Sequence, residues 1–410
     1  MGLRLRKVRL ESFRSYDRFE LDDIGALTVL DGENAAGKTN ALEGVQLLTA
    51  LSSFRHPTAR QLVAWGHDAA RLSARIEGDD GRLLEVDAVL KEGSRTYRLN
   101  GKPRRAAELR GMLPAVCFTP DDLELAKGSN GVKRTALDDM GSQMSRNYHA
   151  VRRDYEKMLR QKNRLLKDGA PAAFRASVDD VLVAVGAHLT AKRADVLARL
   201  RPYVQDYYRT LSGGVERVDV SYVPSWVSWD AERPWERAFA LEEARSELAR
   251  AVEAGSQREL DRGRALWGPH ADAIAFFVDG RNAAQFASQG QQRSLVLAFK
   301  LAEVALVREM TGQQPVLLLD DVMSELDARR RDALVEFIEG DIQTFITTTN
   351  LGYFSKSLLD RARIVRLRKD EGVTHVEMDV DLPRETPEGQ AGRRTGDGVR
   401  MVDAEGDERP

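Results

Sequence analysis

The stretch Gly32-Glu33-Asn34-Ala35-Ala36-Gly37-Lys38-Thr39 matches the pattern G-x-x-x-x-G-K-[ST]. The apolar run 27–30 before it is typical of a short buried strand, and residues 40–48 after it have the apolar spacing of a helix. Such a loop between a strand and a helix cradles phosphates, because backbone N–H groups point inward and the helix N-terminus favours anions. We therefore expect residues 32–39 to bind a nucleotide, with Lys38 on the phosphates and the Thr39 hydroxyl on Mg²⁺. The alternative is a chance glycine-rich turn.

A second run places two carboxylates at the end of an apolar strand. Residues 316–319 are Val-Leu-Leu-Leu, and Asp320 and Asp321 follow them. In open α/β sheets, ligands bind beyond the carboxyl ends of the strands. We expect Asp320 to hold Mg²⁺, and Asp321 to orient or deprotonate an attacking water, so that Lys38, Asp320 and Asp321 are the candidate catalytic residues. The alternative is that both acids cap the helix that follows.

A third element is Ser288-Gln289-Gly290, which opens a helix expected over 291–310. A Ser-x-Gly turn at a helix N-terminus is itself an anion site. The order of phosphate loop, long insertion, second anion-binding helix start and acidic strand is that of an ABC-type ATPase. In that arrangement Ser288 and Gly290 serve the nucleotide held by the partner subunit. Residues 211–214 resemble the ABC signature by letters, but they end a helix, where glycines are ordinary cap residues.

Thr349 follows an apolar strand expected over 344–348. ABC proteins usually carry a histidine at this position. The threonine hydroxyl can hydrogen-bond a γ-phosphate but cannot act as a base, so Thr349 is a candidate nucleotide-binding residue. The glutamine that ABC proteins keep near the Mg²⁺ site is not evident, since Gln46 and Gln61 are poorly placed for it.

The remaining pattern indicates an α/β fold built around a P-loop ATPase head. Short alternating runs between residues 70 and 99 suggest an antiparallel β meander. Strands alternating with helices after residue 266 suggest a parallel-type sheet covered by helices. We therefore predict a discontinuous ABC-type head formed by residues 1–120 and 266–370.

The segment 121–265 has a different character from the head. Its pattern is largely helical, with strong helices expected over 151–167, 178–189 and 191–211, and we interpret it as an inserted helical lobe. The tail 383–410 is rich in Pro, Gly and charge and has almost no large apolar residues. It cannot bury enough surface to offset its ordering entropy, so we expect it to be disordered.

Composition narrows the possible classes of protein. The 410 residues are 42% hydrophobic and 31% charged, and no apolar run is long enough to cross a bilayer, so we expect no membrane association. The single cysteine, Cys117, cannot form an internal disulfide, which suits a cytoplasmic location. The formal net charge is −2, so any nucleic-acid binding requires a local basic patch.

Three groups of basic residues are candidates for that patch: those within 102–105, those at 133 and 134, and those on the helix expected over 151–167. Phosphate neutralisation requires clustered Lys and Arg side chains. The alternative for each group is an ordinary solvated surface, since helix surfaces are commonly charged. The candidates are Lys102, Arg104, Arg105, Lys133, Arg134, Arg152, Arg153, Lys157, Arg160, Lys162 and Arg164.

In combination these motifs resemble the RecF family, SMC-like members of the ABC ATPases. The resemblance extends to about residue 370. Besides the three elements above, it is carried by residues 10–16 (Leu-Glu-Ser-Phe-Arg-Ser-Tyr), 118–123 (Phe-Thr-Pro-Asp-Asp-Leu), 160–166 and Gly268-Pro269-His270. Two positions depart from the family pattern, because Ala35-Ala36 replaces a glycine-bearing loop centre and Ala271 replaces a basic residue.

The resemblance implies an ATP- and Mg²⁺-dependent homodimer that binds DNA. It implies action at gaps between single-stranded and duplex DNA in recombinational repair and replication, where RecO and RecR assist recombinase loading. It also implies a weak, DNA-dependent ATPase in which ATP acts as a dimer clamp. Arg14 resembles the arginine that SMC-like heads direct at the nucleotide.

Two other classes of ATPase share the phosphate loop. A transporter subunit would have a smaller insertion and a histidine at position 349. A nuclease-linked head would carry a further acidic metal cluster after the ATPase part. Both remain alternatives to a DNA-repair ATPase, as a generic ABC or SMC-like subunit.

Overall fold

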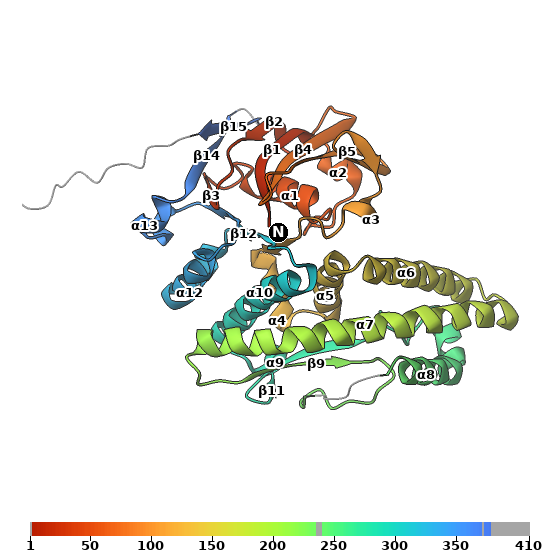
Figure 1. Cartoon of the computed structure of the whole chain (residues 1–410). Coiled ribbons are helices and arrows are strands. Elements are labelled where there is room, and N and C mark those ends of the chain that lie inside the picture. Colours follow the sequence, from red (N-terminus) through yellow and green to blue (C-terminus); the bar gives the residue numbers. More distant parts are fainter. Residues whose placement is uncertain (1, 235–239, 371–372, 379–410) are drawn as a thin grey trace, which may run out of the picture.

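The computed structural model describes residues 2–234, 240–370 and 373–378. The segment 383–410, which we expected to be disordered, lies outside the described residues. The chain forms a head with two sheets and a mainly helical lobe (Figure 1). No helix in the described ranges has the length and apolar character needed to span a membrane.

The central sheet of the head has six strands in the order β15-β14-β3-β13-β12-β8. All neighbouring pairs are parallel except β14 and β15, which are antiparallel. Strands β14 and β15 were not expected from the sequence. The strands are β3 (Leu27–Asp31), β8 (Ala115–Phe118), β12 (Val316–Asp320), β13 (Thr344–Thr348), β14 (Arg363–Asp370) and β15 (Val373–Met378).

The expected antiparallel meander is a second six-stranded sheet in the order β2-β1-β4-β5-β6-β7. The basic stretch after Gly101 contributes its edge strand β7, which pairs with β6. The strands are β1 (Leu3–Phe13), β2 (Tyr16–Leu21), β4 (Ala69–Gly78), β5 (Leu83–Lys91), β6 (Ser94–Leu99) and β7 (Lys102–Arg104).

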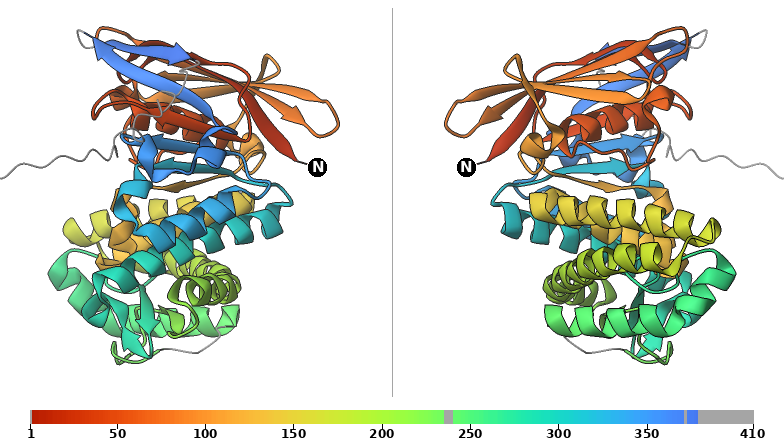
Figure 2. Two further views of the ribbon diagram at one scale, coloured as in Figure 1. Left: turned by 90° about the vertical axis from the view of Figure 1, so that its left-hand side faces the viewer. Right: turned by 90° about the vertical axis from the view of Figure 1, so that its right-hand side faces the viewer.

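Two hydrophobic cores fix the central sheet, one on each face. Side chains alternate between them: Leu317 and Leu319 pack into one core, and Leu318 packs into the other. Helix α1 (Lys38–Thr49) lies between the central sheet and the meander, and α10 (Gln289–Thr311) covers the opposite face (Figures 1 and 2). Burial on both faces explains why these strands read as nearly continuous apolar runs.

The lobe packs on the α10 side of the head and shares its core. It contains α5 (Asn130–Met144), α6 (Arg146–Lys167), α7 (Ala172–Ser212) and α8 (Leu241–Arg262). A three-stranded sheet completes it, in the order β11 (Arg281–Asn282), β10 (Ala273–Val278), β9 (Val218–Val223). Because β10 pairs with β9, residues 273–282 lie in the lobe sheet, beyond the boundary that we expected at residue 265.

The two helices expected over 178–189 and 191–211 are one helix of 41 residues, α7. Pro202 lies inside it and lacks the N–H that would bond to the carbonyl of Ala198. Both residues are exposed, so water can solvate that carbonyl. The remaining helices are α2 (Ala59–Leu62), α3 (Ala106–Leu109), α4 (Glu124–Lys127), α9 (Ala283–Phe286), α11 (Val322–Glu325), α12 (Ala328–Ile338) and α13 (Lys356–Leu359).

Buried polar contacts hold the lobe helices together. The Arg193 guanidinium of α7 donates two hydrogen bonds to Asp138 of α5, at 2.8 and 2.7 Å. Tyr155 of α6 lies 2.6 Å from His270 Nδ1, and the other ring nitrogen of His270 lies 3.2 Å from the carbonyl of Ala265. Burial lowers the pKa of His270, which favours the neutral imidazole. His270 therefore has a structural role in the lobe.

Candidate functional site

Residues 32–37 form the expected loop between β3 and α1, and the loop includes residues in left-handed backbone conformations. Ala35 and Gly37 have positive φ angles of 64° and 98°. A side chain at Gly32 would place its Cβ 2.4 Å from the carbonyl oxygen of Leu367 on β14, so only glycine fits there. The loop is therefore shaped by strand β14 as well as by its own sequence.

Lys38, the first residue of α1, folds back over the loop. Its ammonium group donates hydrogen bonds to the carbonyls of Gly32 and Glu33, at 2.6 and 2.8 Å. Burial lowers the pKa of Lys38, while the nearby carboxylates of Asp321 and Asp320 oppose that shift. The charge is thus held inside the phosphate loop and next to the acidic strand.

Asp320 joins three strand ends into one site. Its Oδ1 accepts a hydrogen bond from the Thr39 hydroxyl at 2.9 Å and another from the Thr347 hydroxyl at 2.8 Å. The Thr347 oxygen in turn accepts a bond from the backbone N–H of Asp321 at 2.9 Å. Thr347 was not among our candidates, because its role appears only when β13 pairs with β12.

The donor set of Thr39 and Asp320 fits Mg²⁺. This ion prefers hard oxygen ligands and is usually held by one or two protein groups, with water and phosphate oxygens completing its shell. A hydroxyl and a carboxylate that already lie within 2.9 Å of each other can share such an ion. When bound, Mg²⁺ would neutralise charge on nucleotide phosphates.

Asp321, expected to orient or deprotonate an attacking water, directly follows β12 in an unusual backbone conformation. Its φ of 51° is uncommon for a residue other than glycine, and its buried Oδ1 has no hydrogen-bond partner among the described residues. Burial raises the pKa of its carboxyl group above the ordinary value. A strained, unsatisfied carboxylate at a strand end is typical of a functional position.

Further side chains surround the phosphate loop from the meander side. Arg14 forms a bidentate ion pair with the buried Glu43 of α1, with both contacts at 2.8 Å. The Ser15 hydroxyl accepts a bond from Asn40 at 2.9 Å, and the Tyr16 hydroxyl donates to the carbonyl of Gly37 at 3.1 Å. Arg14 thus lies beside α1 and supports it.

Ser288 begins α10 as expected, with a capping box. Its Oγ accepts a bond from the N–H of Gln291 at 3.2 Å, and the Gln291 side chain accepts from the N–H of Ser288 at 2.8 Å. The carbonyl of Gly290 accepts a bond from Arg330 of α12 at 2.7 Å. The bond to Arg330 holds the turn against α12. Because Ser288 and Gln289 are exposed, another molecule can contact the turn.

Residues 211–214 end a helix as expected, and Thr349 follows β13 at the edge of the sheet where its predicted nucleotide contact would lie. Thr349 is exposed and directly follows β13, at the same sheet edge as Asp320. Gly213 caps the C-terminus of α7 with a left-handed φ of 75°. Gln46 and Gln61 are engaged away from the acidic strand, since their side-chain oxygens accept from the N–H groups of Phe54 and Thr58.

Four of the basic candidates for nucleic-acid contact are corrected by the structure. Lys162 is buried between Asp179 and Glu259, at 2.8 and 2.5 Å. Lys133 is buried over the ring of Phe276. Arg134 is half-buried and donates to the carbonyl of Asp272, and Arg152 is tied to Asp139 and Glu156. The exposed candidates are Lys102, Arg104, Arg105, Arg153, Lys157, Arg160 and Arg164.

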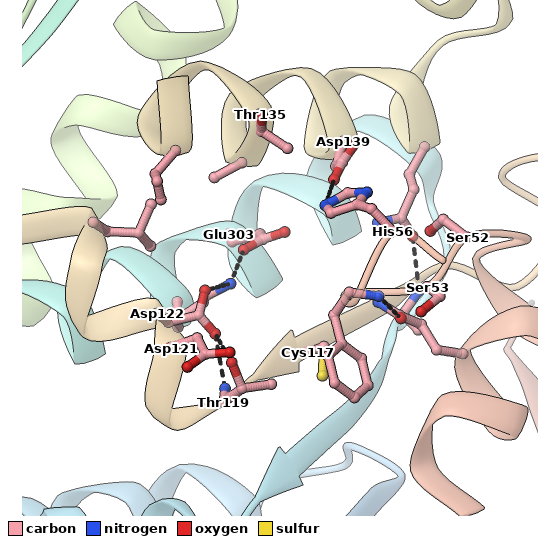
Figure 3. A pocket seen from close by; sticks show the side chains of 18 of the residues that line it. Ser52, Ser53, His56, Cys117, Thr119, Asp121, Asp122, Thr135, Asp139 and Glu303 are labelled. Atoms are coloured by element: carbon pink, nitrogen blue, oxygen red, sulfur yellow. Dashed lines mark hydrogen bonds and ion pairs between the residues drawn. The ribbon is translucent and has the colours of Figure 1, made fainter. Parts of the chain in front are cut away.

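A cavity of about 480 Å³ lies beside the nucleotide site, between α1, β8, α5 and α10 (Figure 3). Its walls carry Asp121, Asp122, Asp139 and Glu303. The buried Lys300 lies 2.9 Å from Asp122, which balances part of this charge. Residues 32–39 do not line the cavity, so it is separate from the phosphate loop.

Comparison with known proteins identifies the family. The model of the RecF/RecN/SMC N terminal domain matches residues 4–375. A DNA replication and repair protein RecF from Rippkaea orientalis is 37% identical over 378 residues, covering 88% of this chain and 97% of the relative. The chain belongs to the RecF family. A RecF from Gloeobacter violaceus is likewise 37% identical, over 374 residues, covering 89% and 97% of the two chains.

Solved structures agree with that assignment. The recombination mediator protein RecF with ATP, of the RecFOR pathway, is 25% identical and has a TM-score of 0.80, covering 92% of this chain and 98% of the other. An Smc head domain from Pyrococcus furiosus, at 13% identity and a TM-score of 0.51, covers 92% and 96% and shows the fold alone. The predicted fold of an ABC/SMC-type head with a β meander and helical lobe is confirmed.

Thr347→Val should weaken Mg²⁺-dependent nucleotide binding. The change removes the hydroxyl that positions Asp320 and leaves the N–H of Asp321 without its acceptor. Loss of a group that orients a metal ligand typically costs about tenfold or more in metal affinity. The measurement is the Mg²⁺ concentration at half-maximal binding of a fluorescent ATP analogue.

Thr344→Val is the matched control for this variant. Thr344 lies on the same strand and is equally buried, but among the described residues its hydroxyl donates to the carbonyl of Ile342 at 3.3 Å and not to Asp320. Its Mg²⁺ requirement should equal that of the wild type. Equal Mg²⁺ requirements for both variants would contradict the role given to Thr347.

Proposed function

We propose that the chain is an ATP-dependent DNA-binding protein of recombinational repair and replication. The observation that carries this proposal is the division of the nucleotide site. Lys38, Thr39 and Asp320 lie together around the phosphate loop, whereas the capped turn at Ser288 is exposed at the start of another helix. The relatives named RecF, and the RecF described with ATP, support the assignment to this process.

ATP and Mg²⁺ bind at the phosphate loop in this proposal. Lys38 and the loop N–H groups hold the phosphates, and Thr39 and Asp320 hold Mg²⁺. Asp321, with its raised pKa and unpartnered oxygen, accepts the proton of the attacking water. The exposed Thr349 hydroxyl binds the γ-phosphate side in this proposal. Arg14, whose guanidinium is engaged by Glu43 and the Gln61 carbonyl, supports α1.

A second copy of the chain completes the site with Ser288 and Gly290. Two equal chains can meet face to face, so that each turn covers the other chain's nucleotide. ATP then acts as a clamp between two heads, and slow, DNA-dependent hydrolysis releases the dimer. The clamp acts at gaps between single-stranded and duplex DNA in the cytoplasm, where RecO and RecR assist recombinase loading.

ATP with Mg²⁺ should shift the protein from monomer to dimer in sedimentation velocity. Lys38→Met removes the phosphate-binding charge, and Ser288→Arg places a bulky side chain at the covering turn, so each change should abolish the shift. Thr58→Arg is the control, because Thr58 begins another exposed capping box. An unchanged wild-type profile at saturating ATP would contradict the proposed clamp.

DNA binding should depend on the exposed charges of α6. The triple change of Lys157, Arg160 and Arg164 to Gln should weaken binding and lower the slope of log K against log salt by about three, if each charge neutralises one phosphate. Fluorescence anisotropy with a gapped duplex over a salt series measures this slope.

Changing Arg209, Arg245 and Arg361 to Gln is the charge-matched control. These arginines are also exposed on their side chains, by 67%, 57% and 67%. Equal slopes for the α6 triple variant and the control would mean that the α6 charges are solvated surface.

By contrast, Lys162→Gln should lower the melting temperature, because breaking a buried ion pair costs about 3–5 kcal/mol.

A further inference from the structure

A second, smaller cavity lies where the segment after α3 meets α5 and α6. Its volume is about 230 Å³. Arg110, Arg152 and Arg153 line it, together with Ser142, His149 and the acids Asp139 and Glu156. Of these, only Arg152 and Arg153 were among our sequence candidates. The cavity brings together a residue of the head, Arg110, and residues of the lobe.

The two acids that line this cavity, Asp139 and Glu156, already accept hydrogen bonds from Arg152. Arg152 donates to Asp139 at 2.8 Å through Nη1 and to Glu156 at 3.0 Å through Nε. Arg110 forms no ion pair in the part of the chain that the structure describes. Burial lowers the pKa of Arg110, and the carboxylate of Asp139 opposes that shift without forming an ion pair with it in the described part of the chain. An anionic ligand in the cavity would further stabilise the Arg110 charge.

Two buried donors in the cavity have no acceptor among the described residues. The Ser142 side chain is only 3% exposed, and its Oγ has no hydrogen-bond partner. The Nε of Arg110 is likewise buried and unpartnered. More than nine-tenths of buried polar groups in folded proteins are satisfied, so two in one small cavity point to a missing acceptor.

The pKa shift of His149 also indicates an excess of positive charge in this cavity. Burial lowers the pKa of His149, and Arg110, Arg152 and Arg153 lower it further, while only Glu156 opposes them. Asp139 also lines the larger cavity, which carries Asp121, Asp122 and Glu303 (Figure 3). Of these two neighbouring cavities, the one at Arg110 has the chemistry for an anion.

A row of exposed charges leads away from this cavity. Arg153, Lys157, Arg160 and Arg164 follow one another at helical spacing, so they share one face of α6. The row extends about 16 Å at the rise of an α-helix. One DNA strand carries a charge about every 3.4 Å along the duplex axis, so the row can follow several phosphates.

We propose that the Arg110 cavity binds one backbone phosphate of DNA and anchors the end of the DNA-binding row on α6. Arg110 and Arg153 supply charge, and the Ser142 hydroxyl donates a hydrogen bond to a phosphate oxygen. This inference rests on the proposed DNA-binding function and adds to it a defined phosphate site. The site also places head and lobe residues on the same DNA.

The test measures binding of a fluorescent gapped duplex with ATP and Mg²⁺, using Arg110→Gln, Arg153→Gln and Ser142→Ala. Each arginine variant should bind about threefold or more weakly and lower the salt slope by about one. Arg361→Gln is the matched control, since its side chain is 67% exposed, like that of Arg153, and is also next to an acid.

Ser142→Ala separates a binding role from a structural one. Removing an unsatisfied buried hydroxyl should leave the melting temperature unchanged or raise it, because no internal hydrogen bond is lost. DNA affinity should nevertheless fall measurably. If all three variants bind DNA as tightly as wild type and Arg361→Gln, the phosphate site is wrong, whereas absence of DNA binding by the wild type would overturn the proposed function itself.

Inorganic phosphate distinguishes DNA from a free anion as the ligand. Titrated at constant ionic strength, it should compete with DNA for the wild type only weakly. A phosphate-induced rise in melting temperature that Arg110→Gln abolishes, with DNA affinity unaffected by that variant, would assign the cavity to a free anion and overturn the proposal.

Discussion

The nucleotide site depends on the carboxylate of Asp320. Its Oδ1 accepts bonds from Thr39, in the first turn of α1, and from Thr347, near the end of β13. Because β3, β13 and β12 are neighbouring parallel strands, their carboxyl ends meet at one edge. The apolar side chains that alternate between the two cores fix those strands, and the strands fix the site.

Local patterns predicted the parts of this site that lie on continuous stretches of chain. The phosphate loop, the acidic pair after β12 and the Ser288 cap were all expected in the correct local structure. Thr347 and strand β14 were missed, because their contacts with Asp320 and Gly32 join residues far apart in sequence. Strand pairing created these contacts, and no local periodicity signals them.

The charge pattern of the sequence was the least reliable predictor of which lobe residues are exposed. Six of the basic candidates lie on helix α6, yet Lys162 is buried between two acids from α7 and α8. Opposite charges that meet only after helix packing cannot be paired from sequence. The same limit applied to α7, where an exposed Pro202 left the helix unbroken, and to β10, whose partner β9 lies in the inserted segment.

In the proposed function, the phosphate loop is half of a site that a second chain completes. The most direct test mixes the Lys38→Met chain with the Ser288→Arg chain and measures ATP-dependent association by sedimentation. Neither variant should dimerise alone, but the mixture should form heterodimers, because one of their two sites pairs an intact loop with an intact turn. A mixture that stays monomeric while the wild type dimerises would contradict a shared site.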